Sequence, residues 1–254
     1  MQANAQSLPK HGWIGCARCY VSGVSPRLIG TDSPPPWKIE TPNGSWGSSD
    51  PLLIVLGFSR GTRQSQPVPF DEIAFRGMRE QLTKILRALH LLGNDDHVSN
   101  HIVPSEKNFH FASLLRCSIS MWDSKKEQYS KSGNSILERF LADHDTCQVA
   151  ENCVQQFLCK LSTRTKLIMM LGNSSDYIEG CKRLFKTFHP GIKEFNSVSY
   201  TNGRITWIHT IHAAAQGSYV PQWLAGGNSS IGRKFRPAQD AVVHSGVLPL
   251  LSAS

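Results

Sequence analysis

The sequence has no long apolar run and comparatively few acidic residues. No window approaches about 18 uncharged apolar residues, which excludes an ordinary membrane-spanning helix. The first residues also lack the apolar core and the cleavage signature of a secretory signal, so we expect a cytoplasmic protein with no membrane partner. The chain contains 27 Lys and Arg against 19 Asp and Glu, and its net charge of +8 favours a polyanionic partner, with nucleic acid the first expectation.

The sequence lacks the paired cysteines of a disulfide-stabilised domain. Its seven cysteines are odd in number and unevenly spaced, and 254 residues with 40% hydrophobic content can bury a core without cross-links. Cys16 and Cys19 form a CxxC pair inside a glycine-rich opening. This context differs from the strand-to-helix junction of a redox motif, and it leaves open a metal site or two incidental thiols. The other cysteines are Cys117, Cys147, Cys153, Cys159 and Cys181.

Regular structure is indicated after about residue 50. Short apolar runs typical of strands buried on both faces occupy residues 52–56, 109–115, 167–171 and 205–211. Strands that alternate with helices need crossover connections, so the pattern predicts an α/β protein. The expected architecture is a three-layer α/β/α sandwich around a central, mostly parallel four-stranded sheet. Apolar residues at helical spacing lie between the strands, at residues 71–92, 149–161 and 177–188.

We expect one domain across residues 1–254. Residues 1–50 contain clustered Pro and Gly and are predicted to form an irregular N-terminal segment that carries the CxxC pair. Residues 123–145 are predicted to be a polar insertion, and residues 226–254 a C-terminal tail whose basic residues suit a polyanion. Open parallel sheets bind ligands beyond the carboxyl ends of their strands, so the informative segments are residues 57–61, 113–117, 172–175 and 212–219.

Seven short segments of the sequence match, in outline, the motifs of one protein family. They are residues 16–19 (CARC), 57–61 (GFSRG), 73–77 (IAFRG), 113–117 (SLLRC), 151–153 (ENC), 171–172 (LG) and 210–214 (TIHAA). In this order they resemble the CxxC, G-E-x-P-G, P-F-x-G, T-N-x-x-x-C, E-x-C, LG and T-x-H-P-S motifs of the uracil-DNA glycosylase superfamily, most closely its iron-sulfur branch. The resemblance spans about residues 12–225, and its specificity lies in the order of the motifs.

The resemblance implies an iron-sulfur cofactor. Thiolates are the usual ligands of such a group. The interval between Cys117 and Cys153 is longer than the family's usual one, which leaves Cys147 as a rival for the fourth position. The insertion at residues 123–145 would account for the extra length as an outward loop. The implied four-iron four-sulfur (4Fe-4S) cluster is held by Cys16, Cys19, Cys117 and Cys153.

The resemblance also implies two roles in cleaving a base from deoxyribose. The nucleotide must first leave the base stack, and Phe75 is expected to stack on the flipped base. Without the resemblance, an ordinary core residue would be the interpretation of Phe75. Breaking the glycosidic bond places negative charge on the departing base, and His212 is expected to donate a hydrogen bond to the base oxygen as a neutral imidazole. His209 is the runner-up for this role.

The sequence departs from the family's motifs at the expected site. Phe58 stands where the branch has the Glu of its first loop, and no acid occurs between residues 57 and 70. Ser113 stands at the place of the Asn that reads uracil, and Ala213 replaces the Pro after the histidine. These substitutions leave three interpretations open: a divergent glycosylase, a glycosylase with another base preference, and a binder that has lost activity.

Other polar residues are expected to compensate for the missing loop acid. Gln64 would orient the attacking water, and Asp71 or Glu72 would stabilise positive charge on the sugar. Arg60 and Arg63 would hold phosphates. The expected substrate-binding positions are Gly57, Phe58, Ser59, Arg60, Phe75 and Ser113.

The segment after His212 corresponds to the loop that the family inserts into the minor groove. Gln216 or Tyr219 would fill the space that the flipped base leaves, with Ser218 also placed against DNA. An ordinary turn into a helix near residue 221 is the competing interpretation.

The sequence therefore predicts a monomeric DNA repair enzyme, a hydrolase of base excision repair that removes uracil from single- or double-stranded DNA and leaves an abasic site. The alternatives are an impaired family member that binds uracil or abasic DNA, and a glycosylase for other deaminated bases. A lyase activity is not expected, because the segments that match the family contain no lysine positioned to form a Schiff base.

Overall fold

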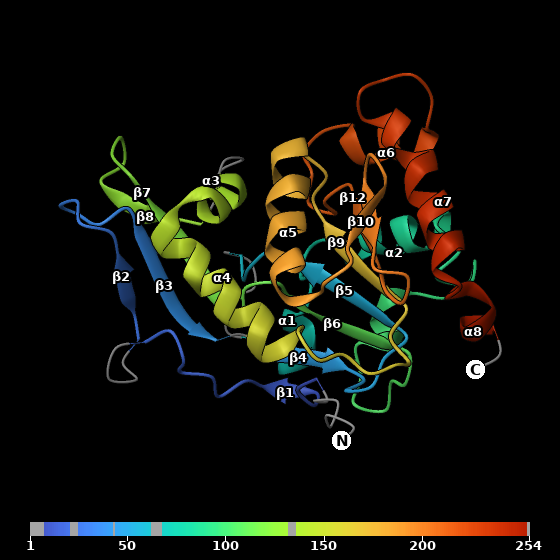
Figure 1. Ribbon diagram of the computed structural model, residues 1–254, viewed down its shortest axis with the longest axis horizontal. Coiled ribbons are helices and arrows are strands. Elements are labelled where there is room, and N and C mark those ends of the chain that lie inside the picture. The colour runs from blue at the N-terminus through green and yellow to red at the C-terminus, as the bar shows by residue number, and fades with distance from the viewer. Residues whose placement is uncertain (1–7, 21–24, 43, 62–67, 132–135, 253–254) are drawn as a thin grey trace.

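The computed structural model describes residues 8–20, 25–42, 44–61, 68–131 and 136–252. Its strands form two sheets (Figure 1). The larger sheet has eight strands in the order β1-β4-β6-β5-β9-β12-β11-β10, and the smaller has four in the order β2-β3-β7-β8. Within the described ranges, no helix is long and apolar enough to cross a membrane.

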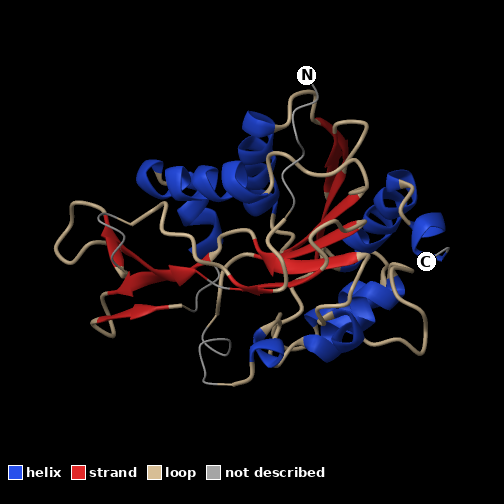
Figure 2. Ribbon diagram, turned by 90° about the horizontal axis from the view of Figure 1, so that it is seen from below, coloured by secondary structure: helices blue, strands red, loops and turns tan. Residues whose placement is uncertain are grey.

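The centre of the larger sheet is the predicted parallel four-stranded core. Neighbouring parallel strands in the order β6-β5-β9-β12 pair without a shift in register. Every residue of these strands is buried, because helices cover both faces of the sheet (Figure 2), and this explains their continuous apolar runs. The prediction of a three-layer α/β/α fold is confirmed. The bounds are β5 (Leu53–Gly57), β6 (Phe109–Ser113), β9 (Leu167–Leu171) and β12 (Thr206–Thr210).

Short antiparallel strands extend this core at both edges, beyond the four strands that the sequence predicted. Two of them continue the sheet beyond β6 and two continue it beyond β12. They contain only two to four residues each, too few to show a periodic pattern. Their bounds are β1 (Gly12–Trp13), β4 (Gly44–Gly47), β10 (Lys193–Asn196) and β11 (Ser199–Thr201).

The smaller sheet combines two segments that the sequence analysis treated as irregular or inserted. Its central strand, β3, alternates buried Trp37 and Ile39 with the more exposed Lys38, a period of two that the preceding prolines obscured. β3 pairs with β7, and β7 pairs with β8 of the predicted insertion, so strands from the N-terminal segment and from the insertion share one sheet. The bounds are β2 (Arg27–Ile29), β3 (Trp37–Pro42), β7 (Cys117–Asp123) and β8 (Gln128–Ser130).

The helices form two groups, one of α3, α4 and α5 and the other of α2, α6 and α7. The helix predicted over residues 71–92 is divided, because Phe75 and Gly77 adopt positive φ angles of 50° and 74° that a helix cannot continue through. The bounds are α1 (Phe70–Ile73), α2 (Arg79–Ala88), η3 (Val98–His101), α3 (Ile136–Ala142), α4 (His144–Phe157), α5 (Ser175–Phe188), α6 (Tyr219–Ala225), η4 (Gly232–Lys234), α7 (Phe235–Ser245) and α8 (Leu248–Ser252).

Residues 226–254, for which the sequence indicated little periodic structure, contain α7. This helix buries Ala238, Ala241 and Val242 and packs against β12. The three residues recur at helical spacing, but Ala is a weak apolar signal, so the sequence pattern did not reveal the face. The C-terminal segment is therefore a structural layer of the domain.

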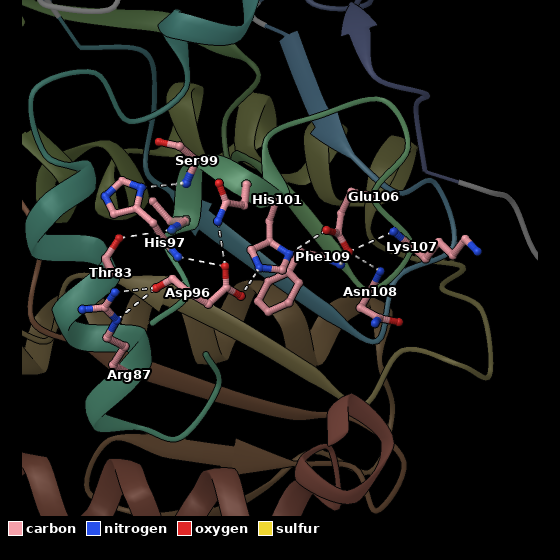
Figure 3. A network of polar contacts seen from close by, with 12 residues as sticks. Thr83, Arg87, Asp96, His97, Ser99, His101, Glu106, Lys107, Asn108 and Phe109 are labelled. Carbon is pink, nitrogen blue, oxygen red and sulfur yellow. Dashed lines mark hydrogen bonds and ion pairs between the residues drawn. The ribbon is translucent and has the colours of Figure 1, made fainter. Parts of the chain in front are cut away.

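A histidine between two carboxylates fixes the loop at the amino ends of the parallel strands (Figure 3). His101 Nε2 lies 2.6 Å from Asp96 Oδ2, and its Nδ1 lies 2.6 Å from Glu106 Oε2. Burial of His101 opposes its charge, but hydrogen bonds to Glu106 and Asp96 outweigh this, so its pKa is raised. Glu106 Oε1 also accepts hydrogen bonds from the backbone N–H groups of residues 107, 108 and 109. The pKa values of both carboxyls are lowered, although burial alone would raise them.

The stability that this clamp contributes depends on pH in both directions. The raised pKa of His101 gives stability below its unfolded value of 6.5 that is lost as the pH rises through the folded value. The lowered carboxyl pKa values give stability above 3.8 and 4.5 that is lost as the pH falls. We expect His101→Gln to lower the free energy of unfolding by about 1.5–3 kcal/mol at pH 5.5, and by less at pH 8.5.

Chemical denaturation at the two pH values measures this difference. Val98→Ala is the matched control, because Val98 is buried in the same segment and carries no titratable group. Its cost should be the same at both pH values. An equal cost of His101→Gln at pH 5.5 and pH 8.5 would show that the clamp is uncharged.

Candidate active site

The carboxyl ends of the four parallel strands lie side by side, and we call this boundary of the sheet the carboxyl edge. Gly57, the last residue of β5, pairs with Ser113, the last residue of β6. On the other side, Thr210 of β12 pairs with Leu171 of β9. The segments that the sequence analysis selected therefore follow strands at a common edge, as parallel pairing requires.

Gly57, Phe75 and Ser113 lie together at this edge. A Cβ atom on Gly57 would stand 3.7 Å from Phe75 Cε1 and 4.0 Å from Ser113 Oγ. The Phe75 ring is 4% exposed and meets Phe111 edge-on at 6.0 Å. Its positive φ is uncommon for a residue with a side chain, and such conformations persist only where the surroundings enforce them. The buried Phe75 ring is thus held in one position beside Gly57.

His212 follows β12 at the same edge and is set up as a hydrogen-bond donor. Its Nδ1 accepts a hydrogen bond from the backbone N–H of Ala214 at 3.0 Å, which places the ring proton on Nε2. Burial lowers the pKa of His212, so the ring is neutral at pH 7. Within the part of the chain that the structure describes, no side chain or carbonyl accepts from Nε2. The Nε2–H group is therefore available to a ligand.

His209, the alternative histidine, has both ring nitrogens engaged inside the core. Its Nδ1 donates to the carbonyl of Gly172 at 3.0 Å, and its Nε2 accepts from the hydroxyl of Tyr200 at 3.3 Å. Burial lowers the pKa of His209 to about 4. This arrangement favours His212 as the histidine that meets a ligand.

The residues of the first loop, which directly follows β5, differ from one another in burial. Phe58 is buried, with its ring edge-on to Phe140 at 6.0 Å and to Tyr177 at 5.9 Å, so it packs in the core. Ser59 and Arg60 are half-buried, and the Arg60 guanidinium lies 5.9 Å from the ring centre of Trp13. Arg63 and Gln64 fall outside the described residues.

The two acids proposed to replace the loop Glu lie at the start of the divided helix. The exposed Asp71 accepts a hydrogen bond from His11 Nε2 at 2.6 Å, so it already has a hydrogen-bond partner. Glu72 is also exposed and lines an open groove with Arg76 and Arg79. Both carboxylates are accessible to solvent.

The loop after His212 is exposed. Gln216 and Ser218 are on the surface, and Tyr219 is 51% exposed at the start of α6. Ser218 Oγ accepts a hydrogen bond from Gln222 Nε2 at 2.7 Å, which ties the loop to the helix that follows. The loop thus presents polar and aromatic side chains immediately beyond the histidine.

Two charged residues lie at this edge although the sequence did not place them there. Glu138 of α3 accepts a hydrogen bond from Ser174 Oγ at 2.6 Å, and Ser174 follows β9. Lys234 Nζ donates to the carbonyl of Asn173 at 2.5 Å. Glu138 belongs to the predicted insertion and Lys234 to the predicted tail, so nothing in their local sequence placed them beside a strand end.

Four of the seven cysteines line a separate pocket. Tyr20 donates a hydrogen bond to Cys117 Sγ at 3.3 Å. Burial raises the pKa of Cys117 to about 11 and raises that of Cys153 further. Cys147 does not line this pocket: it lies half-buried on α4, near Glu151 and Arg183. The four cysteines that line it are the predicted set of Cys16, Cys19, Cys117 and Cys153.

The wall of the cysteine pocket contains a buried cation. Arg116 is 1% exposed, and its guanidinium lies 5.0 Å from the ring centre of Phe157. Its Nη1 donates to Ser45 Oγ at 3.3 Å, while Nε and Nη2 have no partner among the described residues. Burial lowers the pKa of Arg116 to about 10. A charge buried without a counterion is costly, so this pocket suits an anionic group.

The pocket is not arranged for a single metal ion. Within the described ranges, no three His, Cys, Asp or Glu side chains lie close enough together to hold one. A lone ion stands about 2.3 Å from each thiolate, which brings the sulfur atoms close together. In a 4Fe-4S cluster each thiolate binds a different iron atom, so the ligands stand farther apart. The pocket thus offers four thiols, the ligand type of such a cluster, beside a buried cation.

Of the comparisons with known proteins, the one with solved structures found matches. No family model matches it, and no curated protein matches it. Among solved structures, the crystal structure of wild-type Pedobacter heparinus SMUG2 is similar over 81% of this chain and 77% of that one, with 10% sequence identity and a TM-score of 0.36. At that level the similarity supports no conclusion about fold or function. Statements about either therefore rest on the residues of this chain.

Proposed function

We propose that this protein is a DNA glycosylase that excises uracil by hydrolysis and leaves an abasic site. The observation that carries the proposal is the neutral His212, which presents its Nε2–H at the edge where Gly57, Phe75 and Ser113 meet. The net charge of +8 suits a DNA substrate. The order of motifs that resembles the uracil-DNA glycosylase superfamily supports the choice of base.

The chemistry follows from the charges that form as the bond breaks. The bond between the sugar and the base nitrogen breaks, its electron pair leaves with the base, and positive charge develops on the sugar ring. The Nε2–H of His212 donates to the base oxygen, where the negative charge collects. Phe75 would support the flipped base, and Ser113 Oγ would hydrogen-bond to its edge. A water molecule then adds to the sugar carbon and loses a proton to solvent.

Glu138 is the carboxylate that we assign to the positive charge of the sugar. It reaches Ser174 at the end of β9, the strand between β5 and β12. In the chain, Phe75 comes after β5 and His212 comes after β12, and these two strands flank β9. Asp71, by contrast, is hydrogen-bonded to His11 and lies in the first turn of α1.

We propose in addition that Cys16, Cys19, Cys117 and Cys153 hold a 4Fe-4S cluster. The fit rests on four thiols around one pocket and on the orphaned donors of the buried Arg116. When bound, the cluster would join the N-terminal segment, β7 and α4 covalently. It would also be a negatively charged counterion for Arg116. No step of base removal passes through it.

A single-turnover assay tests the proposed activity. The purified protein is mixed in excess with labelled oligonucleotides that contain one uracil, hypoxanthine or xanthine, and abasic sites are cleaved with alkali. We expect release of uracil from single- or double-stranded DNA. Release of only hypoxanthine or xanthine would contradict the uracil assignment and would support the alternative that Ser113, in place of Asn, favours other deaminated bases.

One observation favours a second function, that of a damage-binding protein without turnover. Phe58, which replaces the family's loop Glu, packs in the core and supplies no group to position water. Tight and selective binding of uracil-containing or abasic DNA, without release of any base, would support this alternative over the glycosylase.

A further inference from the structure

The structure holds an exposed tryptophan in a fixed position outside the proposed base site. Trp13 is 60% exposed, although it belongs to β1 of the larger sheet. Its ring meets the Phe70 ring edge-on at 4.9 Å, and Phe70 in turn stacks on the buried Trp46 at 4.9 Å. The packing from beneath fixes the ring, while more than half of its surface stays open to a ligand.

The strand register places Trp13 at the same edge of the sheet as the proposed site. Trp13 pairs with Gly44 of β4, and Trp46 of β4 pairs with Phe111 of β6. Continued by two residues, this register brings Gly44 level with Ser113, the last residue of β6. Trp13 therefore lies two strands away from Ser113, a distance of about 10 Å at the usual strand spacing. A DNA strand whose base enters the site has its next nucleotides within that distance.

A cation from the first loop completes this surface. Arg60 lies in the loop directly after β5, and its guanidinium stands 5.9 Å from the ring centre of Trp13. An arginine beside an aromatic ring supplies both a phosphate contact and a cation–π contact to the ring. An aromatic face beside a positive charge is the combination that binds single-stranded nucleic acid, since a base stacks on the ring and its phosphate pairs with the cation.

We infer that Trp13 and Arg60 form a binding platform for an unpaired stretch of DNA that flanks the target base. The identity of this strand rests on the proposed function. The strand is unpaired because a base inside a duplex already stacks on its neighbours and offers no free face to Trp13. One flanking base stacks on the indole, and the adjoining phosphate pairs with Arg60.

The experiment measures the affinity for DNA that contains no uracil, so its outcome does not depend on base release. A fluorescently labelled oligothymidine and a labelled duplex are titrated with wild type, Trp13→Ala, Trp13→Phe and Arg60→Ala, with anisotropy as the readout. We expect Trp13→Ala to weaken binding of the single strand by about 5- to 100-fold. Trp13→Phe should recover part of this loss. Arg60→Ala should reduce the slope of log K against log salt by about 0.7.

Phe195→Ala provides the matched control, because Phe195 is an exposed aromatic residue at the opposite end of the sheet, on β10. It should bind single strands as wild type does, and circular dichroism shows whether each variant is folded. Unchanged affinity of folded Trp13→Ala would overturn the platform, and so would an equal loss on the duplex. If the platform variants behave as expected while no base is released, the proposed activity fails and the platform stands.

Discussion

His212→Ala is expected to slow single-turnover release of uracil by about 100- to 1000-fold, the usual cost of removing one donor from a developing negative charge. The imidazole Nδ1 is occupied by the backbone N–H of Ala214, so Nε2–H is the donor that the substitution removes. Affinity for uracil-free DNA should stay unchanged, because the interaction forms only as the bond breaks. His212→Asn, which keeps a neutral N–H donor on a shorter side chain, should recover part of the rate.

His144→Ala is the matched control for this variant. His144 lies exposed at the start of α4, so its removal should leave the rate of release unchanged. Equal rates for His212→Ala and wild type would show that another group donates the hydrogen bond to the base oxygen. A rate that falls together with the affinity for uracil-free DNA would instead indicate that His212 only shapes the loop at residues 213–219.

The sequence predicted the parallel core because burial on both faces forces strands to be continuously apolar. The runs at residues 52–56 and 167–171 correspond to β5 and β9 within one residue. The edge strands could not be predicted in this way. β1 and β4 contain glycines and few apolar residues, and they form because β4 pairs with β6 and β1 pairs with β4. Their formation depends on tertiary pairing, which leaves no local pattern.

The candidate site shows the same division between local and tertiary information. Helical geometry separates Cys147 from Cys153, since six residues turn a helix by about 240° and place the two thiols on different faces. Both cysteines lie within α4, whose first turn is capped by the side chain of Asp143, and the sequence alone did not define this helix start. Glu138 and Lys234 reach the strand ends only because α3 and η4 fold back over the sheet, and no motif marks either residue.

The strongest test of the cysteine pocket is the sign of the effect of Arg116→Met on stability. With the proposed cluster bound, Arg116 and the cluster would form a buried pair of opposite charges, and removal of one partner should cost about 3–5 kcal/mol. For a chain of this size, that corresponds to a drop in Tm of roughly 10 °C. In protein freed of iron by chelation, Arg116 is a buried charge without a counterion. There Arg116→Met should leave the Tm unchanged or raise it.

Thermal unfolding of both preparations, with iron measured on the same samples, gives the two signs directly. Arg18→Met is the matched control, because Arg18 lines the same pocket but is exposed and hydrogen-bonded to Gln155. It should change the Tm little in either preparation. Cys153→Ala should remove the iron and, with it, the difference between the two Arg116 results. A loss of stability upon Arg116→Met that is equal with and without iron would mean that the guanidinium acts through its packing on Phe157 alone, and that the charge it lacks is not supplied by a cluster.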